Sequence, residues 1–233
     1  MCEKINKTSI IMCAYDVENR YQRWITSTAI DNIQRYTNRD EYELILVDNE
    51  PRWELDTKLH HLEIDKHIRL KKDIGYSRSM NYGFKKSNPD YNMCCFIHND
   101  VFVWEGWLPK LIECLDKYET DIIIPNQGVI LRQDVLDSYE DKGRQLDNDA
   151  GVMLMTKETF KKTGGWPREL KSIFHDGGFR KKIAIAGLRL APTRNEVLIT
   201  HPGTTTCWLS DDNFYKNRQR EGIIFNKMER NEI

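Results

Sequence analysis

The five apolar residues at 93–97, MCCFI, are the feature that most constrains how this chain can fold. An unbroken apolar run of this length is typical of a strand that is buried on both faces of a sheet. The run ends at His98, Asn99 and Asp100, and residues 105–118 then show a helical apolar period. In open α/β sheets, ligands bind outside the carboxyl ends of the strands. The stretch therefore predicts a buried strand, then a polar turn that binds a ligand or only caps the strand, and then a helix.

The rest of the chain alternates apolar runs of strand length with helical periods. We expect the other strands at 8–14, 43–47, 67–70, 121–124, 150–155, 189–192 and 196–201. We expect the other helices at 18–36, 77–86, 156–163 and 174–186. Strands joined by helices pair in parallel through right-handed crossovers. The pattern predicts an α/β fold, a Rossmann-type α/β/α sandwich with a mainly parallel central sheet.

Length and charge limit the number of domains and the kinds of partner. The 233 residues fit one large domain, and no apolar stretch approaches the ~20 residues that span a bilayer. The 35 basic and 36 acidic residues give a net charge of −1, which leaves no broad basic field for a nucleic acid. We expect a main domain at 1–209 and a charged C-terminal extension at 210–233 that packs on the same domain.

The six cysteines show no CxxC spacing, and three of them lie inside apolar runs, where Cys behaves as a small hydrophobe. This usage favours a reducing compartment over a disulfide framework. The apolar run near the N-terminus is short and lacks a small-residue cleavage site, so it indicates a first strand rather than a signal peptide. We expect a cytoplasmic protein.

Carboxylates follow three of the expected strands, at Asp16, Asp48 and Asp100, and a fourth, Asp176, lies before a helix. The order of motifs over residues 8–205 resembles the family 2 glycosyltransferases, which have the GT-A fold. The first strand and its end resemble the family's opening strand and nucleotide loop, and the second strand ends in Asp48, where the family contacts the nucleobase. The resemblance implies donor-binding roles for Ala14, Tyr15, Asp16, Asp48, Gly75, Arg78, Asn81, His98 and Asn99.

The same resemblance implies a metal site and a catalytic base. Residues 150–166 are similar to the family's strand-helix-GGW segment, and Asp176 stands where the family has its general base. Asp100 occupies the last position of the D-x-D motif, and His201 matches a later histidine that completes the metal site. The resemblance therefore implies that Asp100 and His201 hold Mn²⁺ or Mg²⁺, and an imidazole ligand favours Mn²⁺.

Two positions differ from the family pattern. His98 stands in place of the first Asp of D-x-D. Three roles remain open for it: it binds the metal, it holds a metal ligand in position, or it donates a hydrogen bond to the ribose. His175 stands in place of the acidic residue before the presumed base, and it is the rival base because its ordinary pKa of ~6.5 lies near working pH. We expect the glycines after Asp176 to leave space for an acceptor, and the helix N-terminus to favour the ionised carboxylate. A plain N-cap is the alternative role for Asp176.

These expectations define a hexosyltransferase that moves a sugar from a nucleotide-diphosphate donor to a hydroxyl of a glycan, with inversion and metal assistance. A UDP-sugar is the favoured donor. Ionised Asp48 can accept the N3–H of uracil or of thymine, but it can also accept from guanine, so this residue does not fix the base. A nucleotidyltransferase is a second enzyme class, but residues 13–24 lack the glycine that its signature needs. A nucleotide-sugar- or glycan-binding module with a degraded site is the alternative that is not an enzyme.

Overall fold

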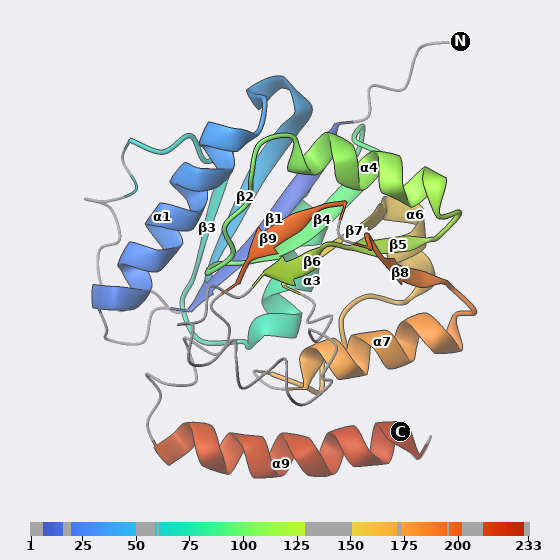
Figure 1. Ribbon diagram of the computed structural model, residues 1–233. Helices are drawn as coiled ribbons and strands as arrows, with labels where there is room; N and C mark the ends of the chain where they lie inside the picture. The colour runs from blue at the N-terminus through green and yellow to red at the C-terminus, as the bar shows by residue number, and fades with distance from the viewer. Residues whose placement is uncertain are drawn as a thin grey trace, which may run out of the picture.

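The computed structural model describes residues 7–15, 20–49, 59, 61–128, 151–171, 174–194, 196–201 and 212–230. Its centre is a seven-stranded sheet with the order β3-β2-β1-β4-β7-β5-β8 (Figure 1). The strands are β1 (Thr8–Tyr15), β2 (Tyr42–Asn49), β3 (Lys66–Leu70), β4 (Met93–His98), β5 (Ile122–Ile124), β7 (Val152–Thr156) and β8 (Leu190–Pro192). Each begins and ends within two residues of the expected range, which confirms the strand assignments.

The sheet is mostly parallel, as expected. β1 pairs in parallel with β2 and β4, β2 with β3, and β5 with β8. β7 is the exception, because it runs antiparallel to both of its neighbours, β4 and β5. The parallel strands β1, β2 and β4 therefore end at one edge of the sheet, and their last residues lie there together.

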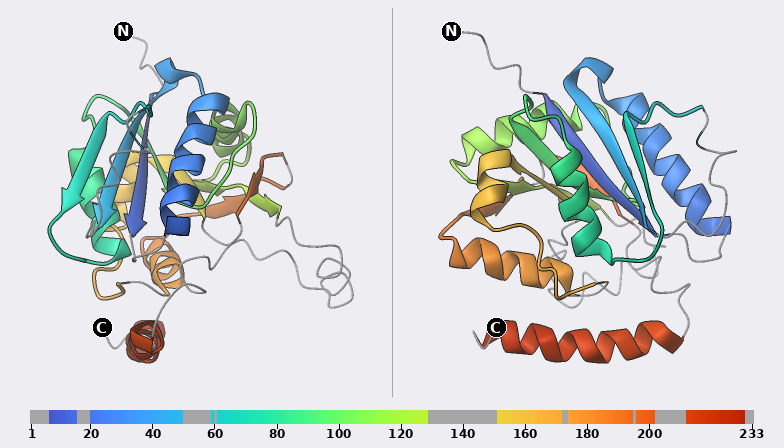
Figure 2. Two further views of the ribbon diagram at one scale, coloured as in Figure 1. Left: turned by 90° about the vertical axis from the view of Figure 1, so that its left-hand side faces the viewer. Right: turned by 180° about the vertical axis from the view of Figure 1, so that it is seen from behind.

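Helices cover both faces of the sheet, which confirms the α/β/α sandwich (Figure 2). α1 (Arg20–Tyr36) and α4 (Trp107–Lys117) cover one face, and α3 (Tyr76–Lys86), α6 (Lys157–Lys162) and α7 (His175–Ile185) cover the other. Alternate residues of a strand point to opposite faces. Ile10 and Met12 of β1 accordingly pack in the α1/α4 core, and Ile11 and Cys13 pack in the α3/α6/α7 core.

A second, two-stranded sheet lies beside the main one. It pairs β6 (Asn126–Gly128) in parallel with β9 (Leu198–Thr200). An isolated antiparallel bridge joins Phe102 to Thr200, with N–H to O=C distances of 2.8 and 2.9 Å. The bridge brings the residues after β4 next to the residues after β9.

The C-terminal extension contains a helix, α9 (Asp212–Glu229), below the carboxyl edge of the sheet (Figure 1). It packs against α7, where the Phe225 ring stacks on Phe174 with the centroids 5.3 Å apart and the planes 13° from parallel. The expected domain boundary at residue 209 lies outside the described residues and stays a prediction. Among the helices that the structure describes, none is long and apolar enough to cross a bilayer.

Candidate active site

Two histidines and an aspartate meet at the carboxyl edge of the sheet. His98 is the last residue of β4, Asp100 lies two residues later, and His201 follows β9. His201 Nε2 is 3.0 Å from Asp100 Oδ1 and 3.4 Å from His98 Nδ1. One ligand atom from each residue lies within 4.8 Å of the others, so the three side chains have the spacing of a metal site. We refer to them as the His-Asp-His cluster.

Backbone pairing explains how residues so far apart in sequence come together. β4 is buried at the centre of the sheet and delivers His98 and Asp100 to its carboxyl edge. The Phe102–Thr200 bridge fixes the segment after β9 against this turn. Both Asp100 and His201 are buried, so the pair is shielded from solvent and its electrostatic attraction is weakly screened.

Burial decides the charge state of His98. The pKa of His98 is lowered from its ordinary value of 6.5 chiefly by burial, although Asp176 and Asp100 act in the opposite direction. The imidazole is therefore neutral at neutral pH, which is the form that binds a metal. Its Nε2 atom is buried and has no hydrogen-bond partner among the residues that the structure describes.

A second group shares His98 with the first. Ligand atoms of His98, His175 and Asp176 also lie within 4.8 Å of one another. His175 and Asp176 are the first two residues of α7, and His175 Nε2 is 3.4 Å from Asp176 Oδ1. The ring of Tyr76 packs on His175 with the centroids 4.1 Å apart, and it also meets His98 edge-on at 5.1 Å. Asp176 therefore lies beside the His-Asp-His cluster at a helix N-terminus, as expected.

The glycines after Asp176 differ from the expectation. α7 begins at His175, before the glycines, and its N-cap is Phe174 in the left-handed region with φ 57°. A Cβ at Gly177 would lie 2.8 Å from the Phe225 ring, and one at Gly178 would lie 2.5 Å from Leu170 Cδ1. The space beside these glycines is filled by α9 and by Leu170, so it is not room for an acceptor.

Asp48 is fully buried at the end of β2, where its Oδ2 atom is 3.2 Å from His67 Nε2. Its Oδ1 atom has no hydrogen-bond partner within the described part of the chain. Neighbouring Asn49 binds the residues before α3, because its Nδ2 donates to Asp73 Oδ1 and its Oδ1 accepts from Ile74 N–H. The end of β2 thus holds an acceptor beside the turn that leads into α3.

Three of the residues expected to bind the donor contact the segment before α7, and their role in donor binding stays a prediction. Asn81 makes two hydrogen bonds of 2.9 Å to the backbone of Trp166. Its Nδ2 donates to the carbonyl oxygen, and its Oδ1 accepts from the N–H. Gly75 has φ 83°, and a Cβ there would lie 2.8 Å from the backbone of Lys171. Arg78 is exposed, and its Nε donates to the carbonyl of Arg168. These contacts hold residues 166–171 on α3.

The remaining expected residues lie near the same edge. Asn99 donates from Nδ2 to Thr26 Oγ1 of α1 at 2.8 Å, so its amide joins α1 to the turn after β4. Ala14 is buried and Tyr15 is half-buried at the end of β1, and Asp16 lies outside the described residues. The sequence interpretation missed His67 and Tyr76 as partners of Asp48 and His175. The only signal for them was their place near the start of a strand and at the start of a helix.

A mostly parallel sheet with one reversed strand beside β4, and acidic and imidazole groups where its strands end, defines a GT-A glycosyltransferase domain. The chain belongs to glycosyl transferase family 2, whose sequence profile matches residues 9–182. Membership of this family confirms the enzyme class that the motifs imply, an enzyme that transfers glycosyl groups.

Solved structures show the same fold. A fragment of TarS from S. aureus, residues 1–349, has a TM-score of 0.61 and 14% sequence identity, with 85% of this chain and 61% of that one covered. GalNAc-T7 with UDP, GalNAc and Mn²⁺ has a TM-score of 0.64 and 14% identity, with 85% and 44% covered. The chain thus spans less than two thirds of either structure, and at this identity the likeness shows the fold alone. No curated protein sequence matches the chain.

Proposed function

We propose that this domain transfers a hexosyl group from a nucleotide-diphosphate sugar, with a UDP-sugar favoured, to a hydroxyl of a glycan, with inversion and with a divalent cation. The observation that carries the proposal is the His-Asp-His cluster with Asp176 beside it, at the carboxyl edge of the sheet, where open α/β sheets bind their ligands. One group of residues suits the diphosphate and its cation, and the other suits the acceptor hydroxyl.

The residues fit a divalent cation. His201 Nε2 lies 3.0 Å from the Asp100 oxygen and 3.4 Å from the His98 nitrogen, so three donor atoms of the kinds that bind divalent cations meet at one place. Two imidazoles and one carboxylate favour Mn²⁺ over Mg²⁺. Asp100 and His201 would hold the ion, with neutral His98 as a third ligand. The chemistry that the ion supplies is electrostatic stabilisation of the leaving diphosphate.

Asp176 serves as the general base in this proposal. The acceptor oxygen attacks the anomeric carbon and gives its proton to the Asp176 carboxylate, while the bond from that carbon to the diphosphate oxygen breaks and the diphosphate keeps the electron pair. The N-terminus of α7 favours the ionised carboxylate that must receive the proton. His175, packed on Tyr76 and 3.4 Å from Asp176, restrains the carboxylate rather than accepting the proton itself.

Asp48 and the end of β1 bind the nucleoside. Asp48 Oδ1 is a buried acceptor without a partner among the described residues, and a uracil N3–H would satisfy it. The structure of GalNAc-T7 with UDP and Mn²⁺, which has the same fold, supports the choice of UDP and of Mn²⁺. The buried cysteines that the structure describes are free thiols, which supports a reducing compartment such as the cytoplasm.

The test is a panel of UDP-, GDP- and dTDP-sugars, each added with Mn²⁺, with Mg²⁺ or with EDTA. Thermal unfolding reports binding, because a ligand that binds only the native state raises its stability. Release of nucleoside diphosphate and the anomeric configuration of the product report transfer. We expect a UDP-sugar with Mn²⁺ to raise the Tm and to be consumed. Retention of configuration would contradict the single displacement, and donor binding without turnover in any glycan would favour a binding module.

A further inference from the structure

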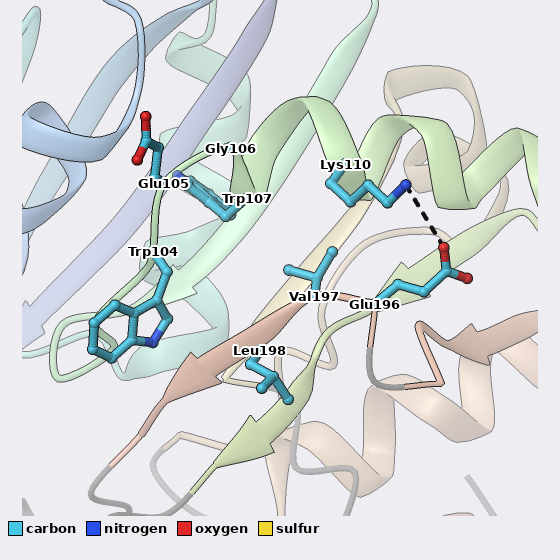
Figure 3. A pocket seen from close by; sticks show the side chains of 8 residues that line it. All are labelled: Trp104, Glu105, Gly106, Trp107, Lys110, Glu196, Val197 and Leu198. Atoms are coloured by element: carbon cyan, nitrogen blue, oxygen red, sulfur yellow. Dashed lines mark ion pairs between the residues drawn. The ribbon is translucent and has the colours of Figure 1, made fainter.

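A pocket of about 540 Å³ opens between the start of α4 and strand β9, outside the His-Asp-His cluster (Figure 3). Its lining joins two segments that are distant in sequence, 104–110 and 196–198. The proposed metal ligands and the proposed base do not line it, so the proposed reaction leaves this pocket unexplained.

Two large apolar side chains are exposed at this pocket. Trp104 is 52% exposed and Leu198 is 51% exposed, and both line this pocket, so two exposed apolar groups lie together here. The Tyr36 ring is a neighbour of the Trp104 ring, with the two ring centroids 6.5 Å apart. An exposed indole offers a flat apolar face with a polar N–H at its edge.

Charged groups lie along the rest of the pocket. Lys110 Nζ is 3.7 Å from Glu196 Oε2, and the dashed line in Figure 3 marks this ion pair. Lys117 and the Tyr118 hydroxyl also bind Glu196, so its position is fixed. An ammonium group only donates hydrogen bonds and a carboxylate only accepts them, whereas a sugar hydroxyl does both. The lining therefore offers hydroxyl groups partners of both kinds beside a flat apolar surface.

The backbone connects this pocket to the His-Asp-His cluster. Phe102 and Thr200 pair antiparallel, so the register places Trp104 opposite Leu198 on one side of the bridge. Asp100 and His201 lie on the other side of the same bridge. Four residues of extended chain span about 13 Å, so Asp100 and Trp104 are separated by roughly that distance. An oligosaccharide of several sugars is long enough to span a separation of this size.

We propose that this pocket is an acceptor subsite, which binds a sugar residue of the glycan remote from the hydroxyl that is attacked. The inference rests on the proposed function for its acceptor class, and it adds the place that holds the acceptor and the residue that recognises it. Trp104 stacks on the sugar ring, and Lys110 and Glu196 bind its hydroxyls. Binding energy from a remote part of a substrate helps to hold the reacting group in position.

Binding is tested first, without turnover. The full chain is labelled with ¹⁵N at its six tryptophan indoles, and Trp104→Phe identifies the Trp104 resonance. The probes are neutral oligosaccharides: cellohexaose, chitohexaose, maltohexaose and xylohexaose. At least one of them shifts the Trp104 resonance, and Trp104→Ala weakens its binding by about tenfold. If no probe shifts this resonance, or if a peptide or a nucleotide does so instead, the proposal is wrong.

Kinetics then separate this inference from the proposed function. Trp104→Ala lowers kcat/KM about tenfold for the oligosaccharide acceptor. The kcat/KM for a monosaccharide acceptor and the kcat/KM for donor hydrolysis stay unchanged. Tyr82→Ala, which removes a 37% exposed aromatic ring from α3, is the matched control and changes none of these values. A shifted Trp104 resonance without any sugar transfer would contradict only the proposed function. Transfer to an oligosaccharide that is equally fast in Trp104→Ala would contradict only the acceptor subsite.

Discussion

His201 Nε2 lies 3.0 Å from Asp100 Oδ1, although the two residues are 101 positions apart in the chain. Both side chains are buried, and each belongs to a segment that follows a strand. The contact joins the central part of the family match to a segment that lies beyond its end at residue 182.

We expect that replacing Asp100 or His201 abolishes the stabilisation of the protein by the divalent cation. Asp100→Asn and His201→Gln keep much of each side chain's volume but lose the anionic ligand or the imidazole. We expect the rise in Tm on adding Mn²⁺ and UDP-sugar to be lost in both variants, each measured against its own Tm in EDTA. Asp116→Asn, an exposed carboxylate on α4, keeps the full rise. An undiminished rise in Asp100→Asn would refute the metal assignment.

Asp176→Asn separates basicity from shape. Loss of a general base typically costs about 10²-fold or more in rate, so kcat falls by that amount while donor affinity stays nearly constant. His175→Gln has a smaller effect, because this residue packs on Tyr76 and only restrains Asp176. The measurement is kcat and donor Kd for both variants over a range of pH. If His175→Gln lost most of its kcat while Asp176→Asn stayed fully active, His175 would be the base and Asp176 the residue that restrains it.

Acid stability tests the Tyr118–Glu196 contact. Hydrogen bonds from Tyr118 and then from Lys117 lower the pKa of Glu196 from its ordinary value of 4.5. A carboxyl group whose pKa is lower in the folded state stabilises that state above its unfolded pKa, and this contribution is lost as pH falls through the folded pKa. We therefore expect Tyr118→Phe to be less stable than the wild type near pH 7, and the difference to shrink below about pH 4.5.

The measurement for this contact is denaturant unfolding across that range. The hydrogen bond to Glu196 raises the pKa of Tyr118 above its ordinary value of 10.0. The contribution of the contact is therefore also lost at alkaline pH, as pH rises through this raised pKa and the phenol gives up its proton. Glu119→Gln, an exposed carboxylate next to Tyr118 in the sequence, is the control and should not remove the acid dependence. A Tyr118→Phe variant whose deficit is the same at every pH would contradict the assignment.

Two glycines at the α7–α9 contact should respond in opposite ways to alanine. A Cβ at Gly222 meets only the edge of Phe174, at 3.6 Å, whereas one at Gly177 would lie 2.8 Å from Phe225. Replacing Gly by Ala inside a helix gains about 0.5–1 kcal/mol in the absence of a clash. Gly222→Ala therefore stabilises the protein, while Gly177→Ala destabilises it and increases hydrogen exchange in α9. Equal stabilisation by both changes would mean that α9 does not pack here.

Asn81 is predicted to act on stability through Trp166. Removing one partner of buried polar groups costs about 1–3 kcal/mol for each group left unsatisfied, and Asn81→Ala leaves the N–H and the carbonyl of Trp166 without their side-chain partner. We expect a loss of that order in the free energy of unfolding. Lys85→Ala, an exposed change on the same helix, is the control. If Asn81→Ala kept its stability but bound the donor more weakly, Asn81 would act in donor binding, as the motif implies.

Much of the fold was predictable because burial leaves a direct mark on the sequence. The MCCFI run of β4 is apolar at every position because helices cover both of its faces, and its polar end marks the site. The direction of β7 was not predictable. A strand buried on both faces has the same apolar pattern whichever way it runs. Helix α9 was missed because its apolar anchors are sparse and form no continuous stripe.

The candidate site was predictable as a set of positions, and less so as a set of contacts. Asp100, His201 and Asp176 were expected together from the order of the motifs, and the structure brings them to one edge. The partners of Asn99 and Asp48, which are Thr26 and His67, depend on how α1 and β3 pack on the sheet. The sequence around Gly177 offered no sign that the Phe225 ring would occupy the space beside it.

The Phe102–Thr200 bridge also has a consequence for chain entropy. Two backbone hydrogen bonds close a loop of about one hundred residues that contains α4, β5, β7, α6 and α7. Closing a loop this long has a large entropic cost but one that grows only slowly with length. A cation held by Asp100 and His201 would cross-link the ends of that loop as a disulfide does. Insertions between β6 and β7 should therefore change stability little, whereas loss of the cross-link should loosen the whole loop at once.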